Sequence, residues 1–112
     1  MKKTSFIWLA LGLLTFTEAC SDGDPISYSD EIKPLLNKKC LRCHGGIRAL
    51  GGFSLLFPDQ ALAPTESGNL AIVPGKPAAS EMIARIKHHD PDLVMPQEGA
   101  LLTEEEIALL DE

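Results

Sequence analysis

The nine residues KKCLRCHGG, numbers 38–46, place two cysteines and a histidine within five positions. The 112-residue chain contains only one other cysteine, Cys20, so chance composition is a poor explanation for the cluster. Cys40, Cys43 and His44 stand in the spacing Cys-x-x-Cys-His. This spacing is the feature from which the fold and the chemistry of the chain can be worked out.

A helix is expected to lead into this motif. Ser29 or Asp30 can cap its start, and apolar residues follow at helical spacing until Gly45, where a glycine can close a helix C-terminus. The two cysteines and the histidine then stand at i, i+3 and i+4 in the last turn, so their side chains share one face and converge.

Cys-x-x-Cys-His is the attachment signature of c-type haem. The two thiols add across the haem vinyl groups, and the thioethers fix the ring to Cys40 and Cys43. The neutral imidazole of His44 is a good iron donor on the proximal side. A ligating histidine usually donates its other ring N–H to a carbonyl or carboxylate, and we expect a backbone carbonyl near Val73 or Pro74. The motif thus predicts one covalently attached haem c.

Two other uses of the motif have to be weighed. A disulfide-exchange pair does not require the adjacent histidine and usually lies near a βαβ pattern, which this sequence lacks. A structural zinc site could recruit the motif together with His88 or His89, but the dense spacing of four-ligand zinc folds is not present. The sequence therefore favours haem.

An electron-transfer haem needs a second axial ligand, and a methionine opposite the histidine raises the iron potential. Met95 precedes a proline, which biases it away from helical geometry, so an extended segment is expected there. Met82 lies on the apolar stripe of a predicted helix, where a packing role is favoured. His88 and His89 end a polar segment and are expected to face solvent. We predict His44 and Met95 as the two metal ligands.

The remaining elements are expected to be short. The region 45–75 is rich in glycine and proline and predicts loops, with at most a short helix starting at Pro58. A second helix is expected to begin at Pro77 and to end at a His-His-Asp-Pro run. A third begins at Thr103, where Glu106 completes a capping box, and we expect it to pack against the first helix.

The N-terminal residues have the layout of an export signal. Two lysines precede a short apolar run, 6–16, which falls short of the roughly 20 residues that a membrane-spanning helix needs. The sequence TEAC, 17–20, resembles the lipobox of bacterial lipoproteins and predicts a lipidated Cys20, whereas ordinary cleavage before this cysteine would leave a free thiol. We predict a signal peptide over 1–19, a flexible tether over 20–28 and a location in the periplasm or cell envelope, with a lipid anchor in a membrane.

Composition limits the partners and the core. The net charge of −6 argues against a nucleic-acid partner, which would require a basic surface. Beyond the N-terminal segment the aromatic residues are only Tyr28, Phe53 and Phe57, and a domain of under a hundred residues often needs a staple besides its own core. The haem would fill that core, so we expect the protein without haem to be largely unfolded.

Five stretches resemble the planctomycete-type cytochrome c domain, a family related to class I cytochromes c. They are EIKPLLNKKCLRCHG (31–45), AIVPGKP (71–77), SEMIARI (80–86), VMP (94–96) and LTEEEI (102–107).

The resemblance spans Tyr28 to Glu112 and implies an all-α, cytochrome c-like domain over 29–112, with three to four short helices and long loops around one haem. It also implies haem on Cys40 and Cys43, with His44 and Met95 as axial ligands. In two respects the sequence departs from the family. A glutamine follows the Met-Pro pair where a second proline is often found, and the chain ends before the aromatic-containing close of the last helix, which suggests a truncated C-terminal helix.

The sequence therefore predicts an exported mono-haem cytochrome that passes single electrons to or from a redox partner protein and is not itself an enzyme. With both axial positions filled, substrate binding at the iron is not expected. One alternative is the electron-entry haem module of a larger exported oxidoreductase. Another is a ligand-sensing haem in which Met95 is displaceable.

Overall fold

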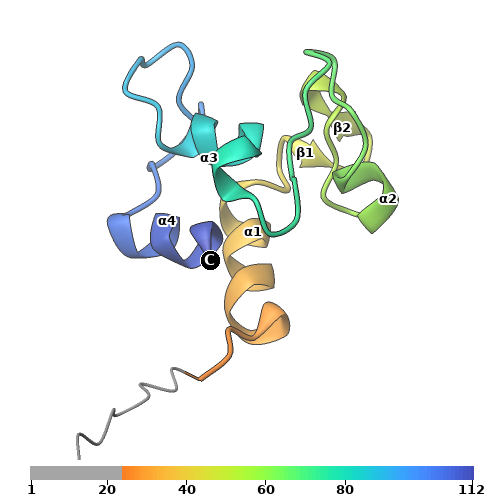
Figure 1. Cartoon of the computed structure of the whole chain (residues 1–112). Coiled ribbons are helices and arrows are strands. Elements are labelled where there is room, and N and C mark those ends of the chain that lie inside the picture. Colours follow the sequence, from red (N-terminus) through yellow and green to blue (C-terminus); the bar gives the residue numbers. More distant parts are fainter. Residues whose placement is uncertain (1–23) are drawn as a thin grey trace, which may run out of the picture.

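The computed structural model describes residues 24–112. The predicted signal peptide, Cys20 and the first residues of the predicted tether lie outside them. Short helices alternate with loops, and one small hairpin follows the first helix (Figure 1). None of the helices within 24–112 combines the length and the apolar character that crossing a bilayer requires. In chain order the elements are η1 (Tyr28–Ile32), α1 (Lys33–Lys39), β1 (His44–Gly45), β2 (Arg48–Ala49), η2 (Leu50–Gly52), α2 (Pro58–Ala61), η3 (Pro77–Ala79), α3 (Glu81–Ile86) and α4 (Glu104–Asp111).

The first helical segment starts and ends earlier than expected. Its cap is Ser27, not Ser29 or Asp30: the Ser27 hydroxyl accepts from the amide of Asp30 at 3.3 Å, and the Glu31 carboxylate accepts from the amide of Ser27 at 2.8 Å. The segment begins as the π-helical turn η1 and continues directly as α1. It ends at Lys39, because the backbone of the next residue leaves helical geometry at φ −121°.

A two-stranded hairpin replaces the expected helix C-terminus. β1 pairs with β2 in antiparallel register, with His44 opposite Ala49 and Gly45 opposite Arg48. Gly46 opens the two-residue loop between the strands with φ +61°, a conformation that glycine adopts without steric cost. The regular elements are therefore mostly helices, but the fold is not purely α, because the glycine pair after the motif turns the chain back on itself.

The following helices keep their expected starts to within a few residues. α2 begins at Pro58, as predicted. Pro77 opens only the 3-10 turn η3, and α3 begins after Ser80, whose hydroxyl bonds the backbone of the preceding loop instead of capping the helix. α4 begins after Thr103, and the predicted capping box with Glu106 is present in both directions.

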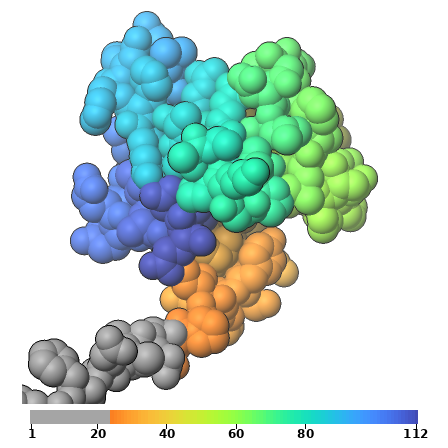
Figure 2. Space-filling view, viewed as in Figure 1, coloured from red at the N-terminus to blue at the C-terminus, as the bar shows by residue number. Residues whose placement is uncertain are grey.

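The core brings α3 and α4 together. Ile83 and Ile86 of α3 are buried with Leu102, and four partly buried side chains pack against this cluster: Met82, Met95, Ile107 and Leu110. The prediction that the last helix packs mainly on the first is therefore wrong. α4 lies beside the first helical segment (Figure 2), but an apolar groove lined by Ile32, Leu36 and Leu109 among others separates the two. The buried cluster against which Ile107 and Leu110 of α4 pack is built on α3.

Candidate haem site

A tight turn after α1 presents the two cysteines and the histidine. The carbonyl of Cys40 accepts from the amides of Cys43 at 3.1 Å and His44 at 2.9 Å, so the backbone makes one further closed turn although the helix has ended. All three side chains are half-buried, and both cysteines carry free thiols. The turn therefore keeps the convergence that was expected from a helical last turn.

The His44 ring is held by Leu50. Its Nδ1 lies 3.0 Å from the Leu50 carbonyl, and the Leu50 amide donates to the carbonyl of Cys43 at 3.1 Å. A carbonyl can only accept, so Nδ1 carries the proton and the lone pair of Nε2 is left available to a metal. The expected acceptor near Val73 or Pro74 is wrong. Strand pairing folds the chain back after the motif and brings a carbonyl only six residues away against the ring.

Two further contacts fix the orientation of the imidazole. The ring of Phe53 lies with its centroid 5.2 Å from that of His44, tilted by 51°, and this phenylalanine is buried. The His44 carbonyl accepts from the amide of Leu55 at 2.8 Å. The histidine is thus constrained through its ring and its backbone by the 50–55 segment, which had no predicted role.

Gly45 is required by close packing and not by its dihedral angles. A Cβ built on it would lie 2.7 Å from the carbonyl oxygen of Leu41 and 2.8 Å from a methyl carbon of the same residue. A glycine that closes a helix, the role expected of Gly45, usually takes the left-handed conformation, and here that conformation is found at the next residue, Gly46. The two glycines therefore have different tasks, one steric and one conformational.

The motif opens onto two adjoining cavities of about 290 and 320 Å³. Five residues line both cavities: Cys40, His44, Leu50, Ile86 and Met95. Cys43 lines the second cavity. Volumes in this range are those of small-ligand and cofactor sites.

The residues fit a haem. The first cavity is lined by aliphatic side chains, a glycine and Phe53, which suit a flat apolar ring, and also by the polar residues 65–67, Glu81 and Arg85. A thiol, an imidazole and a thioether in the same lining can supply the donors for attachment and ligation. No large side chain among the described residues is fully buried, so the domain leaves its centre to be filled.

Met95 reaches the cavities from the loop after α3. Its amide donates to the carbonyl of Arg85 at 3.1 Å, which ties the loop to the end of the helix. The segment is a bend within a loop, not the extended strand that was expected. Met82 lines the first cavity but not the second, whereas Met95 lines both together with His44.

The rival histidine ligands lie elsewhere. His88 and His89 are exposed and line neither cavity, and His88 Nδ1 accepts from the amide of Asp90 at 3.0 Å. Within residues 24–112, no three His, Cys, Asp or Glu side chains gather as they would around a metal ion. The zinc alternative therefore finds no set of ligands in this part of the chain.

Electrostatics at the motif favour the neutral thiol before attachment. Burial raises the pKa of the Cys40 thiol above its ordinary value, and the neighbouring Lys39 ammonium opposes this only in part. Lys39 itself is nearly buried, donates to the carbonyls of Ala100 and Leu101 at 3.1 Å, and lies 3.6 Å from the Glu106 carboxylate. This lysine links the end of α1 to the start of α4.

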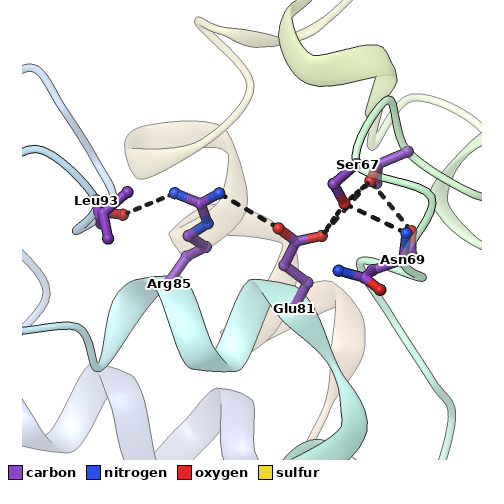
Figure 3. A network of polar contacts seen from close by, with 6 residues as sticks. Ser67, Asn69, Glu81, Arg85 and Leu93 are labelled. Carbon is purple, nitrogen blue, oxygen red and sulfur yellow. Dashed lines mark hydrogen bonds and ion pairs between the residues drawn. The ribbon is translucent and has the colours of Figure 1, made fainter.

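A polar network at the wall of the first cavity was not predicted (Figure 3). Ser67 donates to the Glu81 carboxylate at 2.7 Å, and the same carboxylate pairs with Arg85 one helical turn later at 3.3 Å. Arg85 also donates to the carbonyl of Leu93 at 3.4 Å. The i,i+4 spacing of Glu81 and Arg85 was the available signal in the sequence.

Residues 40–99 match the family model described as Planctomycete cytochrome C. The chain belongs to this family. The matched stretch starts at the first cysteine of the motif and includes Met95, so every predicted haem-site residue lies within it. Among curated proteins none matches the chain, and the same holds for solved structures. Membership of a cytochrome c family implies covalently bound haem c and electron transfer.

Proposed function

We propose that this Planctomycete cytochrome C is an exported mono-haem cytochrome that transfers single electrons, with His44 and Met95 as axial ligands. The observation that carries the proposal is that both residues line the same two cavities with Cys40, while the His44 Nδ1 atom is already bonded to the Leu50 carbonyl. Haem c, when bound, supplies a reversible one-electron Fe(III)/Fe(II) couple.

Cys40 and Cys43 hold the ring to the chain through thioethers. Both cysteines belong to the turn that ends in His44 and line the second cavity with it, so they would hold the haem at two points beside the imidazole. Burial raises the pKa of the Cys40 thiol, which favours its neutral form. The motif residues thus orient the cofactor before the second ligand is engaged.

His44 would be the proximal ligand through Nε2, while its Nδ1–H donates to the Leu50 carbonyl. A hydrogen bond donated by the ring nitrogen that does not coordinate the metal, here Nδ1, increases the basicity of the coordinating nitrogen and fixes the ring orientation. Because that carbonyl belongs to the 3-10 turn η2 directly after the hairpin, the ligand geometry depends on the strand pairing. The hairpin would therefore help to hold the orientation of the imidazole toward a bound haem.

The domain acts as a carrier and not as a catalyst. With histidine and methionine occupying both axial positions, no coordination position is open to a substrate. We propose a redox partner protein outside the cytoplasm, and a signal peptide over 1–19 followed by a lipidated Cys20 that holds the domain at a membrane. The flexible tether would leave the domain free to meet that partner.

The identity of the second ligand is tested by exchanging each methionine for leucine. Leucine keeps the volume but has no sulfur, so packing changes little. In ferric protein produced with haem attached, Met95→Leu is expected to lose the weak long-wavelength absorption band of methionine coordination, and Met82→Leu is expected to keep it. Loss of the band in Met82→Leu alone would overturn the ligand assignment.

Attachment is tested separately from ligation. After denaturation and acid-acetone extraction, the wild-type peptide is expected to retain a coloured, iron-bearing group with the mass of one haem. Cys40→Ala and Cys43→Ala are each expected to yield little stable holoprotein. An extracted peptide without bound haem would refute covalent attachment whatever the result for Met95.

A further inference from the structure

The loop that carries Met95 is closed mainly on itself. The amides of Leu93 and Val94 donate to the carbonyl of Asp90, and the Gln97 side chain donates to the carbonyls of Pro91 and Val94. These bonds shape the loop but do not attach it to the domain. Its position over the cavities must therefore come from other contacts.

Two hydrogen bonds of Arg85 attach the part of this loop that carries Met95. The carbonyl of Arg85 accepts from the amide of Met95 at 3.1 Å, and its guanidinium donates to the carbonyl of Leu93 at 3.4 Å. Among residues 24–112, these are the hydrogen bonds that join 93–97 to residues outside the 88–97 loop. One residue therefore brackets Met95 through its backbone and through its side chain.

The guanidinium is itself held in place. Its second nitrogen pairs with the Glu81 carboxylate at 3.3 Å, and that carboxylate accepts from the Ser67 hydroxyl at 2.7 Å. The hydrogen bond from Ser67, followed by Arg85, lowers the pKa of Glu81, so the carboxylate is charged at neutral pH. Figure 3 shows the line of contacts from the 67–69 loop across α3 to Leu93. Arg85 is thus fixed at both ends of its planar fork.

We propose that Arg85 is a positioning residue for the iron ligand Met95, with Glu81 and Ser67 holding its side chain. The inference rests on the proposed function, because it needs Met95 to be that ligand. A thioether sulfur is an uncharged and weak ligand for iron, so the stability of its bond to the iron depends on how well its loop is pre-positioned. Loosening the loop makes it easier for an added ligand to take the place of the sulfur.

The test uses holoprotein with Arg85→Lys and Arg85→Met. Lysine keeps the positive charge, but its single ammonium cannot reproduce the planar guanidinium that bonds the Leu93 carbonyl and the Glu81 carboxylate at the same time. Methionine removes the charge as well. Neither variant alters the backbone carbonyl at position 85. Lys87→Met is the matched control, because Lys87 sits at the end of the same helix in an ion pair with Asp111 and lines neither cavity.

Two readouts are taken on ferric protein: the strength of the methionine-to-iron absorption band and the affinity for added imidazole. Both Arg85 variants are expected to weaken the band and to bind imidazole about tenfold more tightly, the equivalent of about 1.4 kcal/mol. Lys87→Met is expected to match the wild type. In the ferrous protein, hydrogen exchange at the Met95 amide is expected to be faster in both Arg85 variants.

The outcomes separate this proposal from the function on which it rests. If Met95→Leu abolishes the band and both Arg85 variants keep the wild-type band and imidazole affinity, the positioning role is wrong and the ligand assignment stands. If Lys87→Met changes imidazole binding as much as Arg85→Met, the effect is one of charge or helix stability and the proposal is overturned. If Met95→Leu keeps the band, the ligand assignment itself fails.

Discussion

His44 and its acceptor illustrate how single residues build this site. The imidazole is bonded to a carbonyl six residues later, and this contact exists because the chain reverses at Gly46. Gly45, next to the histidine, admits the Leu41 carbonyl where any side chain would collide. At this scale the motif works because the residues directly after it are small and flexible enough to fold the chain back over the ring.

Gly45→Ala is expected to destabilise the holoprotein by about 1–3 kcal/mol, the usual cost of forcing an extra carbon into a packed site. The added Cβ would lie 2.7 Å from a backbone oxygen that belongs to the motif turn itself. Thermal unfolding followed at the haem absorption band measures the change. Ala49→Ser, which adds one atom on the exposed partner strand, is the control and is expected to stay within about 0.5 kcal/mol. Equal stability of the two variants would contradict the steric argument.

At the scale of elements, short helices are held by caps and by each other. α4 has only eight residues and is marginal alone, so it depends on the Thr103 capping box and on packing against α3. α3 has six residues and is tied to its surroundings through Ser80, Glu81 and Arg85. α3 therefore contributes side chains to the lining of the cavities, whereas α4 contributes none and supports α3 by packing against it.

Thr103→Ala is expected to cost about 1 kcal/mol, because the hydrogen bond from the Glu106 amide to the Thr103 hydroxyl at the start of α4 is lost. For a domain of this size that lowers the melting temperature by about 4–8 °C. Thr103→Ser retains the hydroxyl and is expected to melt close to the wild type. A serine variant as unstable as the alanine variant would show that the cap is not the cause.

The link between α3 and the 67–69 loop is expected to depend on pH. The Ser67 hydroxyl and the Arg85 guanidinium lower the pKa of Glu81 below its ordinary value of 4.5. A carboxyl of this kind stabilises the folded state fully above its unfolded pKa and loses that contribution as the pH falls through its folded pKa.

The free energy of unfolding is therefore expected to differ between wild type and Glu81→Gln by a constant amount near neutral pH. Below about pH 4.5 the difference should shrink as the wild-type carboxyl becomes protonated. Chemical denaturation of both proteins across this range measures it. A difference that stays constant down to acid denaturation would contradict the assignment of the shift to Glu81.

Considered as a whole molecule, the described domain surrounds its centre without filling it. Its buried residues are each still 4–9% exposed, and the second cavity is lined mainly by two segments far apart in the sequence, the motif and the loop that carries Met95. Ligand binding to the folded state stabilises it by mass action, and here the ligand is tied on covalently. The haem is therefore part of the core as well as the electron carrier.

Removal of the haem is expected to abolish cooperative folding. Protein with both motif cysteines changed to alanine, or made without haem attachment, should lose most of its helical circular dichroism and show no sharp thermal transition. The holoprotein should melt cooperatively under the same conditions. A sharp transition near the holoprotein melting temperature in the haem-free protein would show that the polypeptide core suffices.

Much of the element pattern could be predicted from local sequence. The starts of α2 and α4 were predicted to the residue or its neighbour, because Pro58 and Thr103 impose their preferences on adjacent backbone alone. The end of α1 was misplaced by several residues, because the two glycines after the motif serve a hairpin and not a helix cap. Periodicity predicted that α4 has an apolar face but could not say which helix would cover it.

The sequence by itself determined the haem-attachment motif and its family, and it predicted which methionine stands ready as a ligand, because these follow from residue types and their spacing along the chain. Only the tertiary structure decided that Leu50 accepts from His44, that α4 packs on α3, and that Arg85 brackets the Met95 loop. The physical reason is that a carbonyl or a guanidinium finds its partner through the path of the whole chain. That path is fixed by packing between distant segments, which leaves no periodic mark in the sequence.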